Sequence, residues 1–258
     1  MLRNVLFASL LLAATGSASA AGGHALPFSF KADPSNKPSV QRGARTFMNY
    51  CSGCHSMKYM RYNRIGQDLG ISEELLMSNL MFTSDKPGDT ILSAIPAAQA
   101  KEWFGTAPPD LTLTARARGT DWIYSYLKSF YVDPARPMGV NNVVLANASM
   151  PHVLWELQGW QVKKPEGEHH AEGEEKAEGH GGGHGAPNPF ELVQPGKLSP
   201  DEYDRFVGDL VNFMAYAAEP GRSVRVGIGG WTLFYLIIFT GFAWLLKKEF
   251  WKDVPGHH

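Results

Sequence analysis

The residues with the clearest chemistry are Cys51, Cys54 and His55, which form a C-x-x-C-H run with Ser52 and Gly53 between the thiols. This spacing is the pattern of c-type haem attachment. Two thiols on one helical turn can each form a thioether to a haem vinyl group, and the adjacent imidazole then lies beneath the iron. A redox dithiol requires a βαβ context, and a zinc site requires further thiols or a paired histidine. Since neither is visible outside a low-complexity segment, we predict one covalently bound haem c.

A second axial ligand on the opposite side of the iron would set its reduction potential. A methionine thioether favours ferrous iron and therefore raises the potential. Met57 and Met60 lie too close to the C-x-x-C-H run to reach that side, and Met214 belongs to an apolar helical stripe. Met138 and Met150 remain as candidates, and the spacing favours Met150, which is followed by a proline that stiffens the backbone.

Helical periodicity predicts the elements that position these residues. The expected helices cover 40–50, 72–82 with Ser72 as N-cap, 121–131, and a final helix that starts from a capping box at Ser199 and ends before Pro220. No alternating run indicates a strand, and no internal repeat is visible. Residues 22–222 are therefore predicted to be mainly α with long loops.

Two apolar segments predict the compartment. Residues 1–20 have a basic start, an apolar run of ten residues and an Ala-x-Ala end, as in a cleaved signal peptide. Residues 226–246 form an apolar run of 21 residues without a charge. A helix of this length spans about 30 Å, the thickness of a hydrocarbon core. Export then places residues 22–222 in the periplasm of a bacterium, one helix in its inner membrane, and residues 247–258 in the cytoplasm.

The charge is balanced overall but unevenly placed. The 258 residues contain 24 Lys and Arg against 25 Asp and Glu, which argues against a nucleic-acid partner. Residues 166–185 are acidic, of low complexity and too poor in apolar residues to pack. This segment could steer a basic electron acceptor, or bind a metal ion weakly through four histidines, His169, His170, His180 and His184.

Beyond these patterns, the chain resembles the cytochrome c1 family, the haem subunits of ubiquinol–cytochrome c reductase (bc1) complexes. The matching stretches are CSGCHSMKYMRYNRIG from Cys51, APPDLTLTARARGTDWIYSYL from Ala107, NASMPHVLWELQG from Asn147, and AYAAEP from Ala215, directly before the apolar span. The resemblance covers residues 35–252 apart from the acidic segment. The PPDL…ARAR block combined with a C-terminal anchor is more specific than C-x-x-C-H alone.

The resemblance implies a class I c-type cytochrome domain and assigns further site residues. It implies that Met150 is the axial ligand, that Pro108 and Pro109 line the haem edge, and that Arg118 and Arg116 hold a haem propionate. A guanidinium suits this last role because it can pair with a carboxylate through two hydrogen bonds.

The resemblance also implies a function and partners. The chain would accept one electron from a Rieske iron–sulfur protein and pass it to a cytochrome c. Quinol oxidation would belong to cytochrome b, within a dimeric complex in the lipid bilayer. The alternative is a free-standing, membrane-anchored cytochrome c that feeds an oxidase. Co-purification of cytochrome b and a Rieske protein distinguishes the two.

Overall fold

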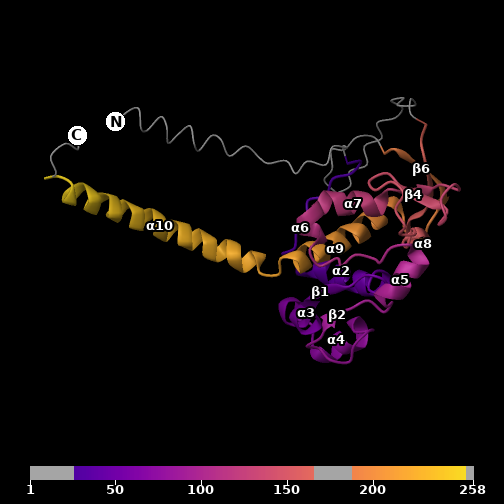
Figure 1. The fold of residues 1–258 in the computed structure, drawn as a ribbon, viewed down its shortest axis with the longest axis horizontal. Coiled ribbons are helices and arrows are strands. Elements are labelled where there is room, and N and C mark those ends of the chain that lie inside the picture. The colour runs from indigo at the N-terminus through magenta and orange to yellow at the C-terminus, as the bar shows by residue number, and fades with distance from the viewer. Residues whose placement is uncertain (1–25, 166–187, 254–258) are drawn as a thin grey trace.

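Helices make up about half of the residues that the computed structural model describes, which are 26–165 and 188–253. The predicted signal peptide and the acidic segment 166–185, with its four histidines, lie outside the described residues. The helices are α2 (Lys37–Tyr50), α3 (Tyr62–Leu69), α4 (Glu73–Leu80), α5 (Ala97–Phe104), α6 (Thr114–Arg118), α7 (Thr120–Lys128), α8 (Trp155–Gln158), α9 (Pro200–Ala218) and α10 (Arg222–Phe250). Figure 1 shows α2 to α9 gathered in one domain, from which α10 projects.

The packing of α2 against α9 forms the centre of this domain (Figure 1). A Cβ atom at Gly43 would lie 2.0 Å from the backbone oxygen of Asp209, so only glycine permits this close approach. The Asp209 carboxylate accepts hydrogen bonds from Ser39 Oγ at 2.5 Å and from Arg42 Nε at 2.6 Å. The rings of Phe47 and Phe213 meet with centroids 5.7 Å apart. A glycine contact, a polar cluster and aromatic packing therefore hold the two helices together.

Gly43→Ala tests this close contact between α2 and α9. The added methyl group must push the helices apart, and overpacking of this kind costs about 1–3 kcal/mol. Thermal denaturation followed by circular dichroism should show a clearly lower midpoint than for the unaltered protein. Gly88→Ala is the control, because a Cβ atom there meets no atom within 4 Å. Equal midpoints for the two variants would contradict the described packing.

The predicted apolar helix faces are confirmed. In α2 the side chains of Val40, Ala44, Phe47 and Met48 are all buried, and a capping Asn36 accepts a hydrogen bond from the backbone of α2. In α9 the capping box at Ser199 is present, and the helix ends before Pro220 as predicted. The predicted helix 72–82 corresponds to α4, which Ser72 caps through its hydroxyl.

The structure adds short strands that no alternating run in the sequence indicates. Within residues 26–165 and 188–253, six short strands form three antiparallel pairs: β1 (Met57–Arg61) with β2 (Thr90–Ile91), β3 (Phe130–Val132) with β4 (Val140–Asn142), and β5 (Gly159–Lys163) with β6 (Phe190–Pro195). Strands of two to six residues are too short to show a clear alternation of polar and apolar residues. The helix expected over 121–131 ends earlier than predicted, at Lys128, because Phe130 begins β3 and pairs with Asn142.

Residues 26–36, directly before α2, form neither helix nor strand, and they are tied to α7. The backbone N–H of Phe28 donates to Ser125 Oγ at 3.2 Å, and that hydroxyl donates back to the Phe28 carbonyl at 2.6 Å. The backbone N–H of Phe30 donates to Asp121 at 2.6 Å. The segment anchors α7, which carries part of the candidate site.

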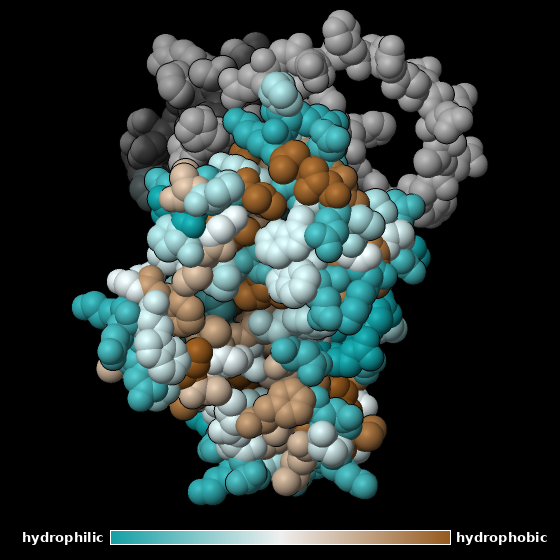
Figure 2. Space-filling view, turned by 90° about the vertical axis from the view of Figure 1, so that its right-hand side faces the viewer, coloured by the Kyte–Doolittle hydropathy of each residue, from teal (hydrophilic) through white to brown (hydrophobic). Residues whose placement is uncertain are grey.

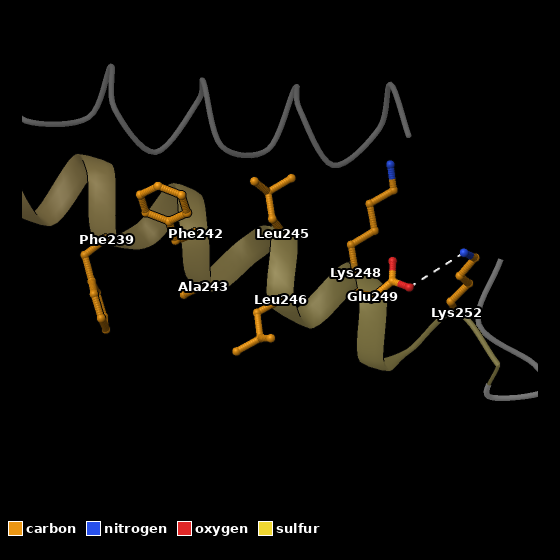
Figure 3. A pocket seen from close by; sticks show the side chains of 8 residues that line it. All are labelled: Phe239, Phe242, Ala243, Leu245, Leu246, Lys248, Glu249 and Lys252. Carbon is orange, nitrogen blue, oxygen red and sulfur yellow. Dashed lines mark ion pairs between the residues drawn. The ribbon is translucent and has the colours of Figure 1, made fainter.

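The C-terminal helix α10 is 29 residues long and is long and apolar enough to cross a membrane. The predicted span 226–246 lies within it, with Arg222 and Arg225 before the apolar stretch and lysines after it. Figure 3 shows a hollow beside its C-terminal half, where Phe239 and Leu246 point to one side of the helix and Phe242 and Leu245 to the other. This hollow is lined mainly by apolar side chains and contains none of the predicted site residues.

Figure 2 views the end of the domain that lies opposite α10. Apolar patches interrupt a largely hydrophilic surface there. Exposed apolar residues in the elements at that end include Trp103 in α5, Trp155 in α8 and Leu192 in β6.

Candidate haem-binding site

The C-x-x-C-H run forms a tight turn directly after α2. The backbone N–H of Cys51 donates to the Phe47 carbonyl at 2.8 Å and ends the helix. The Cys51 carbonyl then accepts from the backbone N–H of Cys54 at 3.0 Å and of His55 at 2.8 Å. Both thiols are free and half-buried, and burial raises the pKa of Cys51 to about 12. The predicted helical turn therefore presents two thiols and an imidazole within five consecutive residues.

The imidazole of His55 is held in the state that a metal ligand requires. Its Nδ1 donates a hydrogen bond to the Pro109 carbonyl at 2.8 Å, which leaves Nε2 without a proton. His55 is only 9% exposed, and this burial lowers its pKa, with smaller opposing contributions from Pro109 and Asp110. The ring is therefore neutral at physiological pH. A carbonyl that fixes the tautomer and orientation of a histidine in this way is typical of metal-binding histidines.

The segment from Pro108 to Leu111 lies against the residues that follow His55. The backbone N–H of Leu111 donates to the Ser56 carbonyl at 2.9 Å, and Asp110 accepts from the backbone N–H of Lys58 at 2.7 Å. Pro108 is half-buried and Pro109 is exposed. These contacts fix the Pro109 carbonyl at His55. The family resemblance implies that Pro109 lies at the haem edge, but it does not reveal this role of its carbonyl.

Met150 lies in the loop after β4, which is tied to α7 by Asn142. The buried Asn142 side chain donates to the Tyr126 carbonyl at 2.8 Å and accepts from the backbone N–H groups of Val144 and Leu145 at 2.9 and 3.2 Å. Met150 is half-buried, and the Tyr126 hydroxyl donates to its sulfur at 3.5 Å. The loop after β4 and α7 therefore jointly fix the position of the Met150 thioether.

The other methionines considered as ligands have different environments. Met57, Met60 and Met214 are buried in the hydrophobic core, in agreement with the roles that their sequence positions suggest. Met138 lies in the turn between β3 and β4 and is 39% exposed. Of the two candidates that spacing left open, Met150 packs against the core and Met138 does not.

The two predicted arginines both lie at the exposed end of α6. The Arg118 guanidinium lies 5.2 Å from the ring centroid of Trp122. Arg116 lies close to Glu219 at the end of α9. The pKa of Glu219 is lowered chiefly by a hydrogen bond from Arg225 and also by the positive charge of Arg116.

The described residues supply the groups that a haem c requires. Two thiols and a neutral imidazole lie on one turn. The thioether of Met150 comes from the loop after β4, and the guanidinium of Arg118 comes from α6. Both groups of residues pack against the same hydrophobic core, to which Cys51, Leu111, Trp122 and Met150 contribute partly buried side chains. Within residues 26–165 and 188–253, no cluster of His, Cys, Asp or Glu could hold a separate metal ion.

Two residues near Met150 were missed by the sequence analysis. One is Tyr126, whose contact with Met150 joins positions 24 apart in sequence. The other is His152, which is 5% exposed and stacks on Phe130 with centroids 5.2 Å apart. Within the described part of the chain, neither ring nitrogen of His152 has a well-formed hydrogen bond. Burial lowers the pKa of His152 to about 4, so the ring is neutral. Both residues lie in stretches that resemble the cytochrome c1 family, but nothing in those stretches singles either of them out.

Comparisons with known proteins identify the family of this chain. The model of the cytochrome C1 family matches residues 27–254. Cytochrome c1 of Allochromatium vinosum is 47% identical over 253 residues, which cover 98% of this chain and all of the relative. The ammonia monooxygenase gamma subunit of Nitrosomonas europaea is 42% identical over 86% of each chain. A solved hyperthermophilic respiratory Complex III chain aligns over 98% of both chains, with 14% identity and a TM-score of 0.43. The chain therefore belongs to the cytochrome c1 family, the electron-transfer haem subunits of bc1-type complexes.

Proposed function

We propose that this chain binds one haem c through thioethers from Cys51 and Cys54, with His55 and Met150 as the axial ligands. The observation that carries the proposal is the hydrogen bond from His55 to the Pro109 carbonyl, which leaves a neutral imidazole with a free Nε2 directly after the second thiol. The bound haem would supply reversible one-electron chemistry of iron. The role of the protein is to hold the ligands, orient them and exclude water.

The ligand set favours electron transfer over bond-forming chemistry. If His55 and Met150 both held the iron, no ligand position would be left for oxygen or peroxide. We propose that Pro108 and Pro109 line the haem edge and that Arg118 and Arg116 hold a propionate. The exposure of both arginines at the end of α6 supports this role, since the side chains can turn toward an anionic group.

We further propose that the chain accepts one electron from a Rieske iron–sulfur protein and passes it to a cytochrome c, as part of a dimeric complex with cytochrome b. The signal-like N-terminus and α10 support a location at a bacterial inner membrane. The haem domain would lie in the periplasm, and the residues after α10 in the cytoplasm. The apolar surface of α10 suits contact with lipid tails and with helices of cytochrome b.

Single-turnover reduction by ubiquinol tests the proposed electron path. In the purified membrane complex, ubiquinol should reduce the haem c of this chain, and added cytochrome c should reoxidise it. Removing the Rieske protein should abolish the reduction, because no other partner carries the electron from quinol to this chain. Reduction at an unchanged rate without the Rieske protein would contradict the proposal.

A second assignment follows from the Nitrosomonas europaea relative, which is named for a monooxygenase. This chain could then associate with a membrane oxygenase. The higher identity and full coverage of the Allochromatium vinosum cytochrome c1 favour the bc1 assignment. The subunits that co-purify with the chain distinguish the two assignments.

A further inference from the structure

The hydroxyl of Tyr126, in the last turn of α7, donates a hydrogen bond to the Met150 sulfur in the loop after β4 at 3.5 Å. We propose that Tyr126 is a positioning residue that uses this hydrogen bond to raise the reduction potential of the haem iron. The inference rests on the proposed function in one respect, namely that Met150 is an axial ligand. Nothing in the C-x-x-C-H run or in the flanking motifs predicts it.

The chemistry of the two groups permits this role. A thioether sulfur has two lone pairs, so it can bind a metal with one and accept a weak hydrogen bond with the other. Tyr126 is 9% exposed, and a tyrosine hydroxyl ordinarily ionises only near pH 10. The hydroxyl therefore keeps its proton at physiological pH and remains a donor.

The donor is held firmly in place. The Tyr126 ring stacks on Trp122 with centroids 5.1 Å apart and an angle of 6° between the planes. On its other side it meets Phe130 at 5.2 Å in an edge-to-face arrangement. The Tyr126 carbonyl accepts from Asn142, the same side chain that organises the loop leading to Met150. Donor and acceptor are therefore fixed relative to each other by a common set of contacts.

The expected effect on the iron has a definite sign. A hydrogen bond to the sulfur withdraws electron density and weakens its donation to ferric iron more than to ferrous iron. Hydrogen bonds to ligand sulfur are known to tune metal potentials. The hydrogen bond should therefore favour the ferrous state, and its loss should lower the potential while strengthening the ferric iron–sulfur bond.

Tyr126→Phe tests the proposal in the purified, haem-loaded complex. This variant removes one oxygen atom and keeps the ring and its stacking. We expect a lower midpoint potential in a redox titration. We also expect the far-red charge-transfer band of methionine-ligated ferric haem to be retained and to persist to higher pH. The matched control is Tyr216→Phe, which removes a buried hydroxyl that donates to Asp68 at 2.9 Å, away from Met150. Its potential should equal that of the unaltered protein.

Three outcomes would overturn the proposal. An unchanged potential in Tyr126→Phe with the band retained would show that the hydrogen bond does not tune the iron. If Tyr126→Phe lost the far-red band at a lower pH than the unaltered complex does, the hydroxyl would only keep the loop in place. If the unaltered complex lacked the band, Met150 would not be a ligand, and this separate result would overturn the ligand assignment itself.

Discussion

Replacing both Cys51 and Cys54 with alanine is expected to abolish covalent haem attachment to this chain. The two are the only cysteines in the sequence, and they lie on one turn after α2. No other thiol can form a thioether. Peroxidase staining of a denaturing gel of membranes should therefore lose the band at the size of this chain. Each single replacement should leave one thioether and a shifted haemochrome spectrum.

The control for the double cysteine variant comes from the same turn. Gly53 lies between the thiols and is exposed, and a Cβ atom there meets nothing within 4 Å. Gly53→Ala should therefore keep full haem staining. If the double cysteine variant still retained haem through denaturation, attachment through these thiols would be wrong.

Met150→Ala is expected to have the second-largest effect. Removing the thioether leaves the iron with a weaker ligand such as water, and the haem becomes high-spin or acquires a much lower potential. Axial ligands move haem potentials over roughly 0.8 V, so we expect a drop of about 0.2 V. The midpoint potential and the spin state in the purified complex provide the measurement.

Met138→Ala is the matched control for Met150→Ala, because Met138 was the other methionine left open by spacing and lies exposed in the β3–β4 turn. It should leave the potential and the spectrum unchanged. A low-spin spectrum and a normal potential in Met150→Ala would exclude Met150 as the ligand. A high-spin spectrum or a much lower potential in Met138→Ala would instead identify Met138 as the ligand.

The parts of the fold that were predicted correctly depend on local patterns. The capping box at Ser199 and the apolar periodicity of α9 are encoded within one helix, and the C-x-x-C-H turn is encoded within five consecutive residues. The apolar span within α10 needs no partner to be visible in the sequence. In each case the signal lies in neighbouring residues.

The parts that were missed depend on contacts between distant residues. The short strands β3 and β4 acquire their structure from pairing with each other rather than from an alternating pattern. The carbonyl of Pro109 meets His55 across 54 positions. A backbone carbonyl has no sequence signature, and a tyrosine on an amphipathic helix looks like ordinary packing. The orientation of both proposed axial ligands was therefore visible only in three dimensions.

The haem content and subunit composition of the complex purified in mild detergent test the central claim most directly. We predict a pyridine haemochrome spectrum of haem c at one haem per chain, with cytochrome b and a Rieske iron–sulfur protein in the same preparation. A chain that purifies alone, with oxygenase subunits, or without haem c would contradict the account.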